Sequence, residues 1–335
     1  MTLSQPLQLA DRYDRVATDL RVSLTDRCNL RCSYCMPAEG LDWLPDDSVL
    51  SDDEVVRLIG IAVRRLGIDE VRFTGGEPMV RRGLVDIVTR TRAIDADLDI
   101  SLTTNALGLS RQAQALADAG LDRVNVSLDS VRAETFHTVT RRDRLDDVLE
   151  GLKAAKAAGL GPVKINAVLL RGINDDQAPE LLRWSIDHGY DLRFIEQMPL
   201  DAQHDWSRAQ MVTADEIFAS LESRFTLTPH GEPRGSAPAE RFLVDGGPAT
   251  VGVIASVTRP FCGDCDRVRL TADGQVRNCL FAREESDLRG ALRAGATDEE
   301  IAQRWVVAML GKRAGHGIDD PSFLQPDRPM SAIGG

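Results

Sequence analysis

The six cysteines of the chain form two groups of three. The first group is Cys28, Cys32 and Cys35, with the spacing C-x3-C-x2-C, and the second is Cys262, Cys265 and Cys279, with the spacing C-x2-C-x13-C. Thiolates at such spacings are ligands of zinc or of an iron–sulfur cluster. A structural zinc site needs four protein ligands, whereas three ligands suit a four-iron cluster that leaves one iron open for a small molecule. Clusters are therefore favoured, and zinc stays the alternative because a histidine distant in the sequence could approach in the fold.

A glycine pair stands one predicted strand–helix unit after the first cysteine group, in the run Phe73-Thr74-Gly75-Gly76-Glu77-Pro78. Adjacent glycines let backbone groups approach a ligand closely, and Glu77 supplies a carboxylate for an amine or a hydroxyl. A Gly-Gly pair before a helix is often only a tight turn, but its position after the cysteines favours a binding site.

The elements that must position these residues are short strands alternating with helices. Runs rich in Val, Ile, Leu and Phe occur at 21–25, 71–74, 100–104, 124–128, 163–169 and 192–195, each followed by a helical stretch. Helix starts are marked by capping boxes, in which Ser51, Thr213 and Thr297 each precede a glutamate by three positions. This rhythm predicts repeated βαβ units and a parallel sheet.

The predicted strands alternate polar and apolar residues, although parallel strands covered on both faces are usually apolar throughout. Arg21 and Ser23 oppose Val22 and Leu24, and Lys164 opposes Val163 and Ile165. If the apolar faces pack on the helices, the polar faces line a lumen. A closed eight-stranded barrel fills its interior with branched side chains, so the pattern favours a wider, partly open barrel that holds a large polar ligand. An antiparallel sheet with one wet face is the alternative.

A change of rhythm after Phe225 predicts a second region. We divide the chain into residues 1–227, an α/β barrel with an N-terminal extension, and residues 228–335. Residues 228–240 are rich in Pro and Gly and are predicted to be a linker or surface loop. A hairpin is expected over 268–271 and 275–278, with its turn at Asp273-Gly274, followed by helices near 284–294 and 299–310. Residues 315–335 lack periodicity and are predicted to be disordered.

Composition excludes several classes of protein. The chain has 335 residues, enough for a large core, and a formal net charge of −12, which disfavours nucleic-acid binding by bulk charge. The first 24 residues are polar and acidic, unlike a signal peptide, and no apolar run reaches membrane-spanning length. We therefore expect a cytoplasmic protein with no membrane partner, whose cysteines are reduced and free to bind metal.

The run Thr25-Asp26-Arg27-Cys28-Asn29-Leu30-Arg31-Cys32-Ser33-Tyr34-Cys35-Met36-Pro37, with Thr74-Gly75-Gly76-Glu77-Pro78, resembles the radical S-adenosylmethionine enzymes. The second cysteine group, the segment Arg267-Val268-Arg269 and the terminal Gly334-Gly335 narrow the resemblance to the GTP 3′,8-cyclase family of molybdenum cofactor biosynthesis. That family implies an incomplete six-unit (βα) barrel similar to a TIM barrel, with a C-terminal region that carries a second iron–sulfur cluster.

The resemblance implies two 4Fe-4S clusters, S-adenosyl-L-methionine as cofactor and GTP as substrate. The first cysteine group would hold the cluster that binds S-adenosylmethionine, and the second would hold the cluster that binds guanine. Cofactor contacts are implied for Tyr34, Gly76, Ser127 and Met198, and GTP contacts for Arg21, Arg72, Thr103, Lys164, Arg267, Val268 and Arg269. A 5′-deoxyadenosyl radical would remove the 3′ hydrogen of GTP, and the resulting carbon radical would attack C8 of guanine.

Further partners follow from the same resemblance. It implies an electron-donor protein, and it allows contact with the downstream cyclic pyranopterin monophosphate synthase and a homodimer. Two residues depart from the family pattern, namely Ala106, where glycine is usual, and Gln197. Another radical S-adenosylmethionine enzyme with an auxiliary cluster, and a non-catalytic zinc protein, are the competing interpretations.

Overall fold

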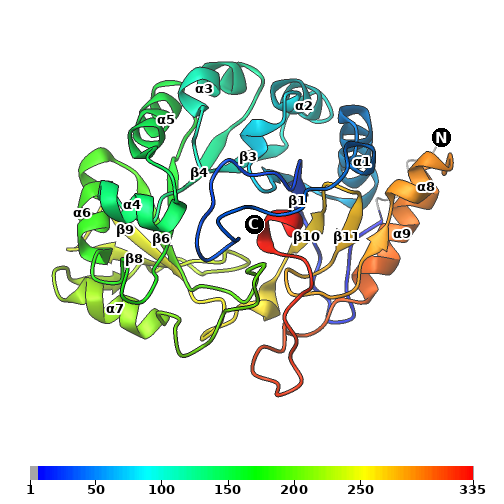
Figure 1. Ribbon diagram of the computed structural model, residues 1–335. Helices are drawn as coiled ribbons and strands as arrows, with labels where there is room; N and C mark the ends of the chain where they lie inside the picture. The colour runs from blue at the N-terminus through cyan, green and yellow to red at the C-terminus, as the bar shows by residue number, and fades with distance from the viewer. Residues whose placement is uncertain (1–6, 335) are drawn as a thin grey trace.

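The computed structural model describes residues 7–334, and its centre is a curved sheet whose first six strands are parallel and lie in chain order (Figure 1). These strands are β1 (Asp19–Ser23), β2 (Glu70–Thr74), β3 (Asp99–Thr104), β4 (Arg123–Ser127), β5 (Lys164–Val168) and β6 (Asp191–Ile195). Each of the six strands starts within two residues of the predicted start. Strand β1 is shifted as a whole, since it starts and ends two residues earlier than predicted. The βαβ prediction is confirmed.

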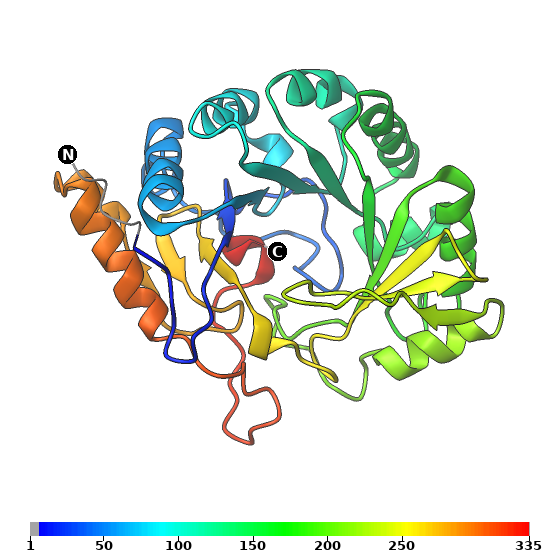
Figure 2. The same ribbon diagram turned by 180° about the vertical axis from the view of Figure 1, so that it is seen from behind.

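Helices cover the outer face of this sheet, as both ribbon views show (Figures 1 and 2). They are α1 (Asp52–Leu66), α2 (Leu84–Arg92), α3 (Leu109–Asp118), α4 (Ala133–Thr140), α5 (Leu145–Ala157), α6 (Ala178–His188) and α7 (Ala214–Glu222). The capping boxes predicted at Ser51 and Thr213 are present, and so is the one at Thr297, which begins α9 (Asp298–Leu310). Apolar strand residues such as Val22, Phe73 and Ile165 are buried against these helices.

The later part of the chain extends the sheet at both edges. Strand β10 (Arg267–Leu270) pairs parallel with β1, and β9 (Thr250–Ile254) pairs parallel with β6. Beyond them, β11 (Gln275–Arg277) and β12 (Ser286–Asp287) continue one edge, and β8 (Glu240–Val244) and β7 (Leu227–Pro229) continue the other. These outer pairings are antiparallel, and β9 and β10 are not paired with each other in residues 7–334. The sheet is therefore an incomplete barrel.

Of three predictions for the second region, two need correction and one is confirmed. The predicted linker 228–240 begins in β7 and ends where β8 starts, because its flanking segments add to the sheet edge. The helix predicted over 284–294 is shorter, since β12 pairs with β11 first and only α8 (Arg289–Arg293) is helical. The hairpin with its turn at Asp273-Gly274 is confirmed, and Gly274 adopts a positive φ of 77°.

The prediction of a disordered tail is wrong for residues 315–334. This segment folds back so that α10 (Met330–Ile333) lies in the middle of the barrel in both ribbon views (Figures 1 and 2). Arg328 donates to both carboxylate oxygens of Asp273, at 2.9 and 2.7 Å, and the Met330 amide donates to the Leu200 carbonyl at 2.9 Å. These bonds fix a segment whose sequence has no periodicity. Gly335 lies outside the described residues.

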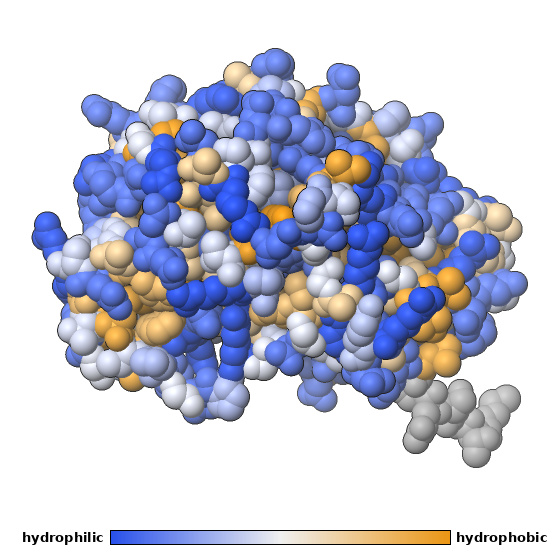
Figure 3. Space-filling model, turned by 90° about the horizontal axis from the view of Figure 1, so that it is seen from below, coloured by the Kyte–Doolittle hydropathy of each residue, from blue (hydrophilic) through white to orange (hydrophobic). Residues whose placement is uncertain are grey.

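The face of the molecule shown in Figure 3 is mainly hydrophilic, with small hydrophobic patches. Among residues 7–334, no helix is long and apolar enough to cross a membrane.

Candidate functional site

The polar residues of the parallel strands face the inside of the barrel, as their alternation predicts. Arg21, Arg72 and Lys164 are partly buried there, whereas the intervening Val22, Phe73 and Ile165 belong to the core under the helices. The register pairs Arg21 with Arg72 across β1 and β2, so their side chains lie on the same face of the sheet. The lumen is therefore lined by cations although the whole chain is acidic.

The first cysteine triplet lies in the loop after β1, at the carboxyl ends of the parallel strands. Cys28, Cys32 and Cys35 are free thiols, and they line a cavity of about 150 Å³. Four predicted contacts, Tyr34, Gly76, Thr103 and Ser127, line the same cavity. The structure thus brings these sequence-predicted residues together around the first triplet.

The glycine pair after β2 is required by backbone packing. A Cβ on Gly75 would lie 2.3 Å from the Thr25 carbonyl oxygen, and one on Gly76 would lie 2.3 Å from the Asp26 carbonyl oxygen. The Gly76 amide donates to the Thr25 carbonyl at 2.7 Å. The pair therefore holds the glycine loop directly against the loop that carries the cysteines.

Glu77 is held by the protein. Its carboxylate accepts hydrogen bonds from the Thr104 hydroxyl at 2.7 Å, the Asn105 amide at 2.6 Å and the Met79 amide at 2.9 Å. Burial raises the pKa of Glu77 to about 7. Asn105 in turn places its side-chain nitrogen 3.9 Å from Cys28 Sγ. Glu77 thus positions the loop after β3 beside the first triplet.

Asp129 fixes Tyr34 in the same cavity. The Tyr34 hydroxyl donates to Asp129 at 3.0 Å, and the other carboxylate oxygen accepts from the Val168 amide at 2.8 Å. Burial raises the pKa of Asp129 to about 6. Sequence reasoning missed this role, although Asp129 lies two residues after the end of β4 and shares the inward face of Ser127.

Burial dominates the acidity of the first triplet. It raises the pKa of Cys28 to about 11, and burial together with the neighbouring Cys28 raises that of Cys35 to about 12. The pKa of Cys32 is also raised well above its usual value, first by burial and then by Asp129. Such thiols are protonated in the absence of a metal and release their protons when a metal binds the sulfur atoms. The site therefore suits a group that binds thiolates strongly.

Three lumen cations have no carboxylate within ion-pair distance among residues 7–334, namely Lys164, Arg193 and Arg269, and Arg269 donates instead to the Gly334 carbonyl. Burial, followed by the nearby Arg193, lowers the pKa of Lys164 to about 8. Burial, followed by Arg72, lowers the pKa of Arg193 to about 10. By contrast, Arg72 donates to Ser101 at 3.2 Å and to Glu70 at 2.5 Å. Buried cations without a paired anion indicate a site for an anionic ligand.

Sequence reasoning missed Arg193 as a lumen residue. It alternates with Leu192 and Phe194 in β6, as Lys164 alternates with Ile165 in β5, and the register pairs β6 with β5 in parallel. The alternation rule that identified Lys164 would have identified Arg193 as well.

The second triplet flanks the hairpin of β10 and β11, with Cys262 and Cys265 before β10 and Cys279 after β11. Cys262, Cys265 and Cys279 are free thiols that line one cavity of about 90 Å³ together with Arg267 and Arg269. Met198 lines this second cavity, so the structure places it beside the second triplet. Val268 packs into the core between the two arginines, and its side chain does not face the lumen.

The electrostatics of the second triplet differ from those of the first. Burial raises the pKa of Cys262. Burial would also raise the pKa of Cys265, but the charges of Arg267 and Lys312 outweigh it and lower that pKa to about 7. Lys312 is itself buried, and its Nζ lies 3.4 Å from Cys265 Sγ.

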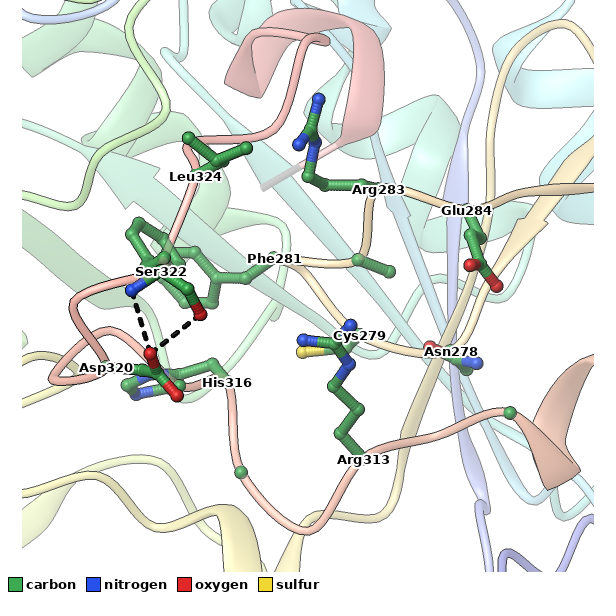
Figure 4. Close-up of a pocket in the computed structure, with 15 residues that line it drawn as sticks. Asn278, Cys279, Phe281, Arg283, Glu284, Arg313, His316, Asp320, Ser322 and Leu324 are labelled. Atoms are coloured by element: carbon green, nitrogen blue, oxygen red, sulfur yellow. Dashed lines mark hydrogen bonds between the residues drawn. The ribbon is translucent and has the colours of Figure 1, made fainter.

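Cys279 also lines a further cavity of about 310 Å³ (Figure 4). Phe281 and His316 line both this cavity and the one around the triplet, and their rings are 4.9 Å apart. Arg313 and Asp320 line the outer cavity, where Asp320 accepts hydrogen bonds from Ser322. Cys279 therefore borders both cavities.

The tail reaches the lumen next to both triplets. Arg269 donates to the Gly334 carbonyl, and Gly334 has a positive φ of 88°. A Cβ on Gly334 would lie 2.8 Å from Thr74 Cγ2 and 3.1 Å from Ser23 Cβ. Glycine is thus needed at this position both for its backbone conformation and for space.

The two departures have different consequences. Ala106 adopts a positive φ of 64°, the conformation in which glycine costs least, so the alanine keeps the turn with some backbone strain. The Gln197 carbonyl accepts a hydrogen bond from the Trp206 indole at 2.9 Å.

The cysteine arrangement fits clusters. Among residues 7–334, no three Cys, His, Asp or Glu side chains converge closely enough to hold a single metal ion, as tetrahedral zinc requires. Three thiols spread around a cavity instead suit a four-iron cluster, whose ligands bind separate corners.

Comparisons with known proteins agree with this geometry. Residues 22–185 match the radical SAM superfamily, and residues 190–318 match the family described as Molybdenum Cofactor Synthesis C. The chain is 69% identical to a GTP 3′,8-cyclase of Streptomyces coelicolor, over 98% of this chain and 96% of the relative. It is 62% identical to a GTP 3′,8-cyclase of Mycolicibacterium smegmatis, over 98% of this chain and 92% of the relative.

A solved structure shares the fold. The crystal structure of Streptococcus suis SuiB bound to S-adenosylmethionine aligns with a TM-score of 0.59 at 13% identity, covering 82% of this chain and 64% of that one.

Proposed function

The chain belongs to the GTP 3′,8-cyclase family of radical S-adenosylmethionine enzymes, and we propose how its two triplets and the lumen divide the work of that reaction. The enzyme cyclises GTP to (8S)-3′,8-cyclo-7,8-dihydroguanosine 5′-triphosphate, the first step of molybdenum cofactor biosynthesis, and it uses S-adenosylmethionine and 4Fe-4S clusters. When bound, these cofactors supply the reductive cleavage of S-adenosylmethionine and the radical chemistry.

We assign the first triplet, Cys28, Cys32 and Cys35, to the cluster that binds S-adenosylmethionine. Tyr34, Gly76 and Ser127 border the same cavity, which supports their assignment as contacts to that cofactor. Glu77 and the glycine pair hold the surrounding loops together, so this part of the chain orients the cofactor and keeps water out.

The lumen cations bind the triphosphate of GTP. Lys164 and Arg193 are partly buried without a carboxylate partner within ion-pair distance in the described part of the chain, and this observation carries the proposal. Arg21 and Arg72 lie on the same face, and Arg267 and Arg269 extend the row toward the second triplet. Thr103 borders the first cavity, and Val268 would contribute only through its backbone.

We assign the second triplet, Cys262, Cys265 and Cys279, to the cluster that binds the guanine of GTP. Met198 borders that cavity, so we propose that it lies between the two ligands. The tail residue Gly334 contacts Arg269 and closes the lumen from one side.

An electron-donor protein is a proposed partner, because the reaction consumes electrons that these residues do not supply. Residues 1–227 and 228–335 remain our proposed division of the chain.

The test is an anaerobic incubation of cluster-loaded protein with GTP, S-adenosylmethionine and a strong reductant, followed by mass spectrometry. Joint accumulation of 5′-deoxyadenosine and the cyclised nucleotide is the expected result. Deoxyadenosine that forms equally without GTP, with no cyclised nucleotide, would favour another radical S-adenosylmethionine enzyme. Absence of both from protein with intact clusters would contradict the enzymatic assignment.

A further inference from the structure

Lys312 is a buried cation at the second triplet. It follows α9, and only 4% of its surface is exposed. Its ammonium group donates to the Cys265 carbonyl at 3.0 Å, to the Arg267 carbonyl at 3.0 Å and to Cys265 Sγ at 3.4 Å. An ammonium group has three N–H donors, so these three acceptors use all of them.

The counter-charge of Lys312 is the sulfur. Among residues 7–334, no carboxylate lies within ion-pair distance of its Nζ, and two of its three acceptors are neutral carbonyls. A buried ammonium without an anion is costly, so the favourable partner is the thiolate of Cys265. If Lys312 only linked the carbonyls of Cys265 and Arg267, an uncharged donor would serve equally well.

The residue type supports the same conclusion. Only four of the forty basic residues are lysines, namely Lys153, Lys156, Lys164 and Lys312. Lys153 and Lys156 are exposed on α5, so just two lysines lie inside the molecule. A planar guanidinium presents its donors in a fixed fork, whereas an ammonium is a compact charge that can reach two carbonyls and a sulfur around one point. At Cys265 the ammonium of Lys312 makes these three contacts from a single nitrogen.

The first triplet offers no such contact. The side-chain donor nearest to Cys28 Sγ is neutral, since it is the Asn105 amide nitrogen at 3.9 Å. Arg31 lies nearby but donates to the carbonyls of Cys28 and Leu30, at 2.6 and 2.8 Å. In the part of the chain that the structure describes, no lysine hydrogen-bonds a cysteine sulfur of the first triplet.

We propose that Lys312 is a positioning residue that tunes the second cluster, because its hydrogen bond and charge at Cys265 Sγ shift the reduction potential of that cluster to a more positive value. Hydrogen bonds and positive charge at cluster sulfurs favour the reduced form, which carries one more negative charge. The proposal rests on the proposed function, which places a cluster at the second triplet. It makes the second cluster easier to reduce than its cysteines alone would.

The test is a potentiometric titration of the anaerobic holoenzyme, monitored by electron paramagnetic resonance. The signal of the second cluster is recognised as the one that GTP changes, and that of the first as the one that S-adenosylmethionine changes. Lys312→Met removes the charge at similar side-chain length, Lys312→Arg keeps the charge, and Lys153→Met makes the same substitution on the outer face of α5.

In Lys312→Met the potential of the second cluster should shift to a more negative value while that of the first cluster is unchanged. Lys312→Arg should recover part of the shift, and Lys153→Met should show none. If Lys312→Met does not fold, Lys312→Gln, which keeps an N–H donor without the charge, should shift in the same direction.

Three results would overturn the proposal. The first is an unchanged second potential in Lys312→Met protein that holds both clusters, and the second is an equal shift of both potentials. The third combines two observations: every Lys312 variant loses part of its second cluster, and the cluster that remains has an unchanged potential. That result would mean that Lys312 only stabilises the fold around the cluster. If the unaltered protein contains only enough iron for one cluster, that result would instead contradict the proposed function.

Discussion

The two cysteine triplets use the same ligand type in different electrostatic surroundings. Burial raises the pKa of Cys28 to about 11 and that of Cys35 to about 12, whereas Arg267 and Lys312 outweigh burial at Cys265 and bring its pKa to about 7. The first triplet lies at the carboxyl ends of the parallel strands, and the second lies where β10 extends the edge of the same sheet. The difference indicates that the chain gives its two cluster sites separate tasks.

Removing one cysteine from either triplet should have the largest effect and should separate those tasks. Cys28→Ala should abolish both 5′-deoxyadenosine and the cyclised nucleotide, because we assign cofactor cleavage to the first site. Cys279→Ala should retain part of the cofactor cleavage and lose the cyclised nucleotide. Mass spectrometry of both products measures the outcome. Normal cyclisation by Cys279→Ala would refute the role given to the second site.

A methyl group on the tail should disturb the region where the two sites meet. Gly334→Ala would place Cβ 2.8 Å from Thr74 Cγ2 at a φ of 88°. Strain of about 1–3 kcal/mol at such a φ, with the clash added, should lower cyclisation by roughly tenfold or more while both clusters remain bound. The matched control is Gly295→Ala, because Gly295 has a φ of 86° and nothing within 4 Å of the added Cβ. Equal losses in the two variants would make the effect one of backbone strain alone.

Lys164 should give the lumen a pH dependence. Its pKa is lowered to about 8 by burial and by Arg193, so its charge is present below that pH and is lost above it. Because the charged form attracts the triphosphate, kcat/KM for GTP should fall several-fold as the pH rises through about 8. Lys164→Arg stays charged over this range, so the fall should disappear in a pH profile of that variant. A profile that keeps the same fall would assign it to another group.

The smallest effect is expected at the ion pairs that hold the tail, which Arg328 forms with Asp273 and Glu285. Arg328 forms a bidentate pair with Asp273 and also lies 2.9 Å from Glu285, so Arg328→Met should loosen the tail and raise KM for GTP by a few-fold. Hydrogen exchange of residues 329–334 should increase in parallel. Arg283→Met is the control, because Arg283 makes one exposed ion pair with Asp327 at 3.3 Å, and such pairs contribute little. Similar changes in the two variants would show that the ion pairs of Arg328 do not specifically hold the tail.

Much of the barrel could be predicted because its information is local. Alternation within each strand identified the inward face that holds Arg21, Arg72 and Lys164, and capping boxes located the starts of three helices. The cysteine and glycine motifs lie in loops directly after β1 and β2, so the order of the strands alone brings them together. Arg193 was missed only because the same alternation was not applied to its strand.

The remaining features depend on contacts between residues distant in the sequence. Arg328 and Asp273 are 55 positions apart, and Lys312 and Cys265 are 47 apart, so no local pattern predicts that they meet. The tail was predicted to be disordered because its order comes from these contacts and not from periodicity. Strands β8 and β9 were missed for a similar reason, since β9 is defined by its pairing with β6.

The most direct test of the division between the triplets asks which cluster touches GTP. Electron–nuclear double resonance can detect the guanine, labelled with a heavy nitrogen isotope, at the reduced cluster of two variants. One variant has alanine at Cys28, Cys32 and Cys35, and the other has alanine at Cys262, Cys265 and Cys279. The account predicts nitrogen coupling only in the variant that keeps the second triplet. Coupling in the variant that keeps only the first triplet would contradict it.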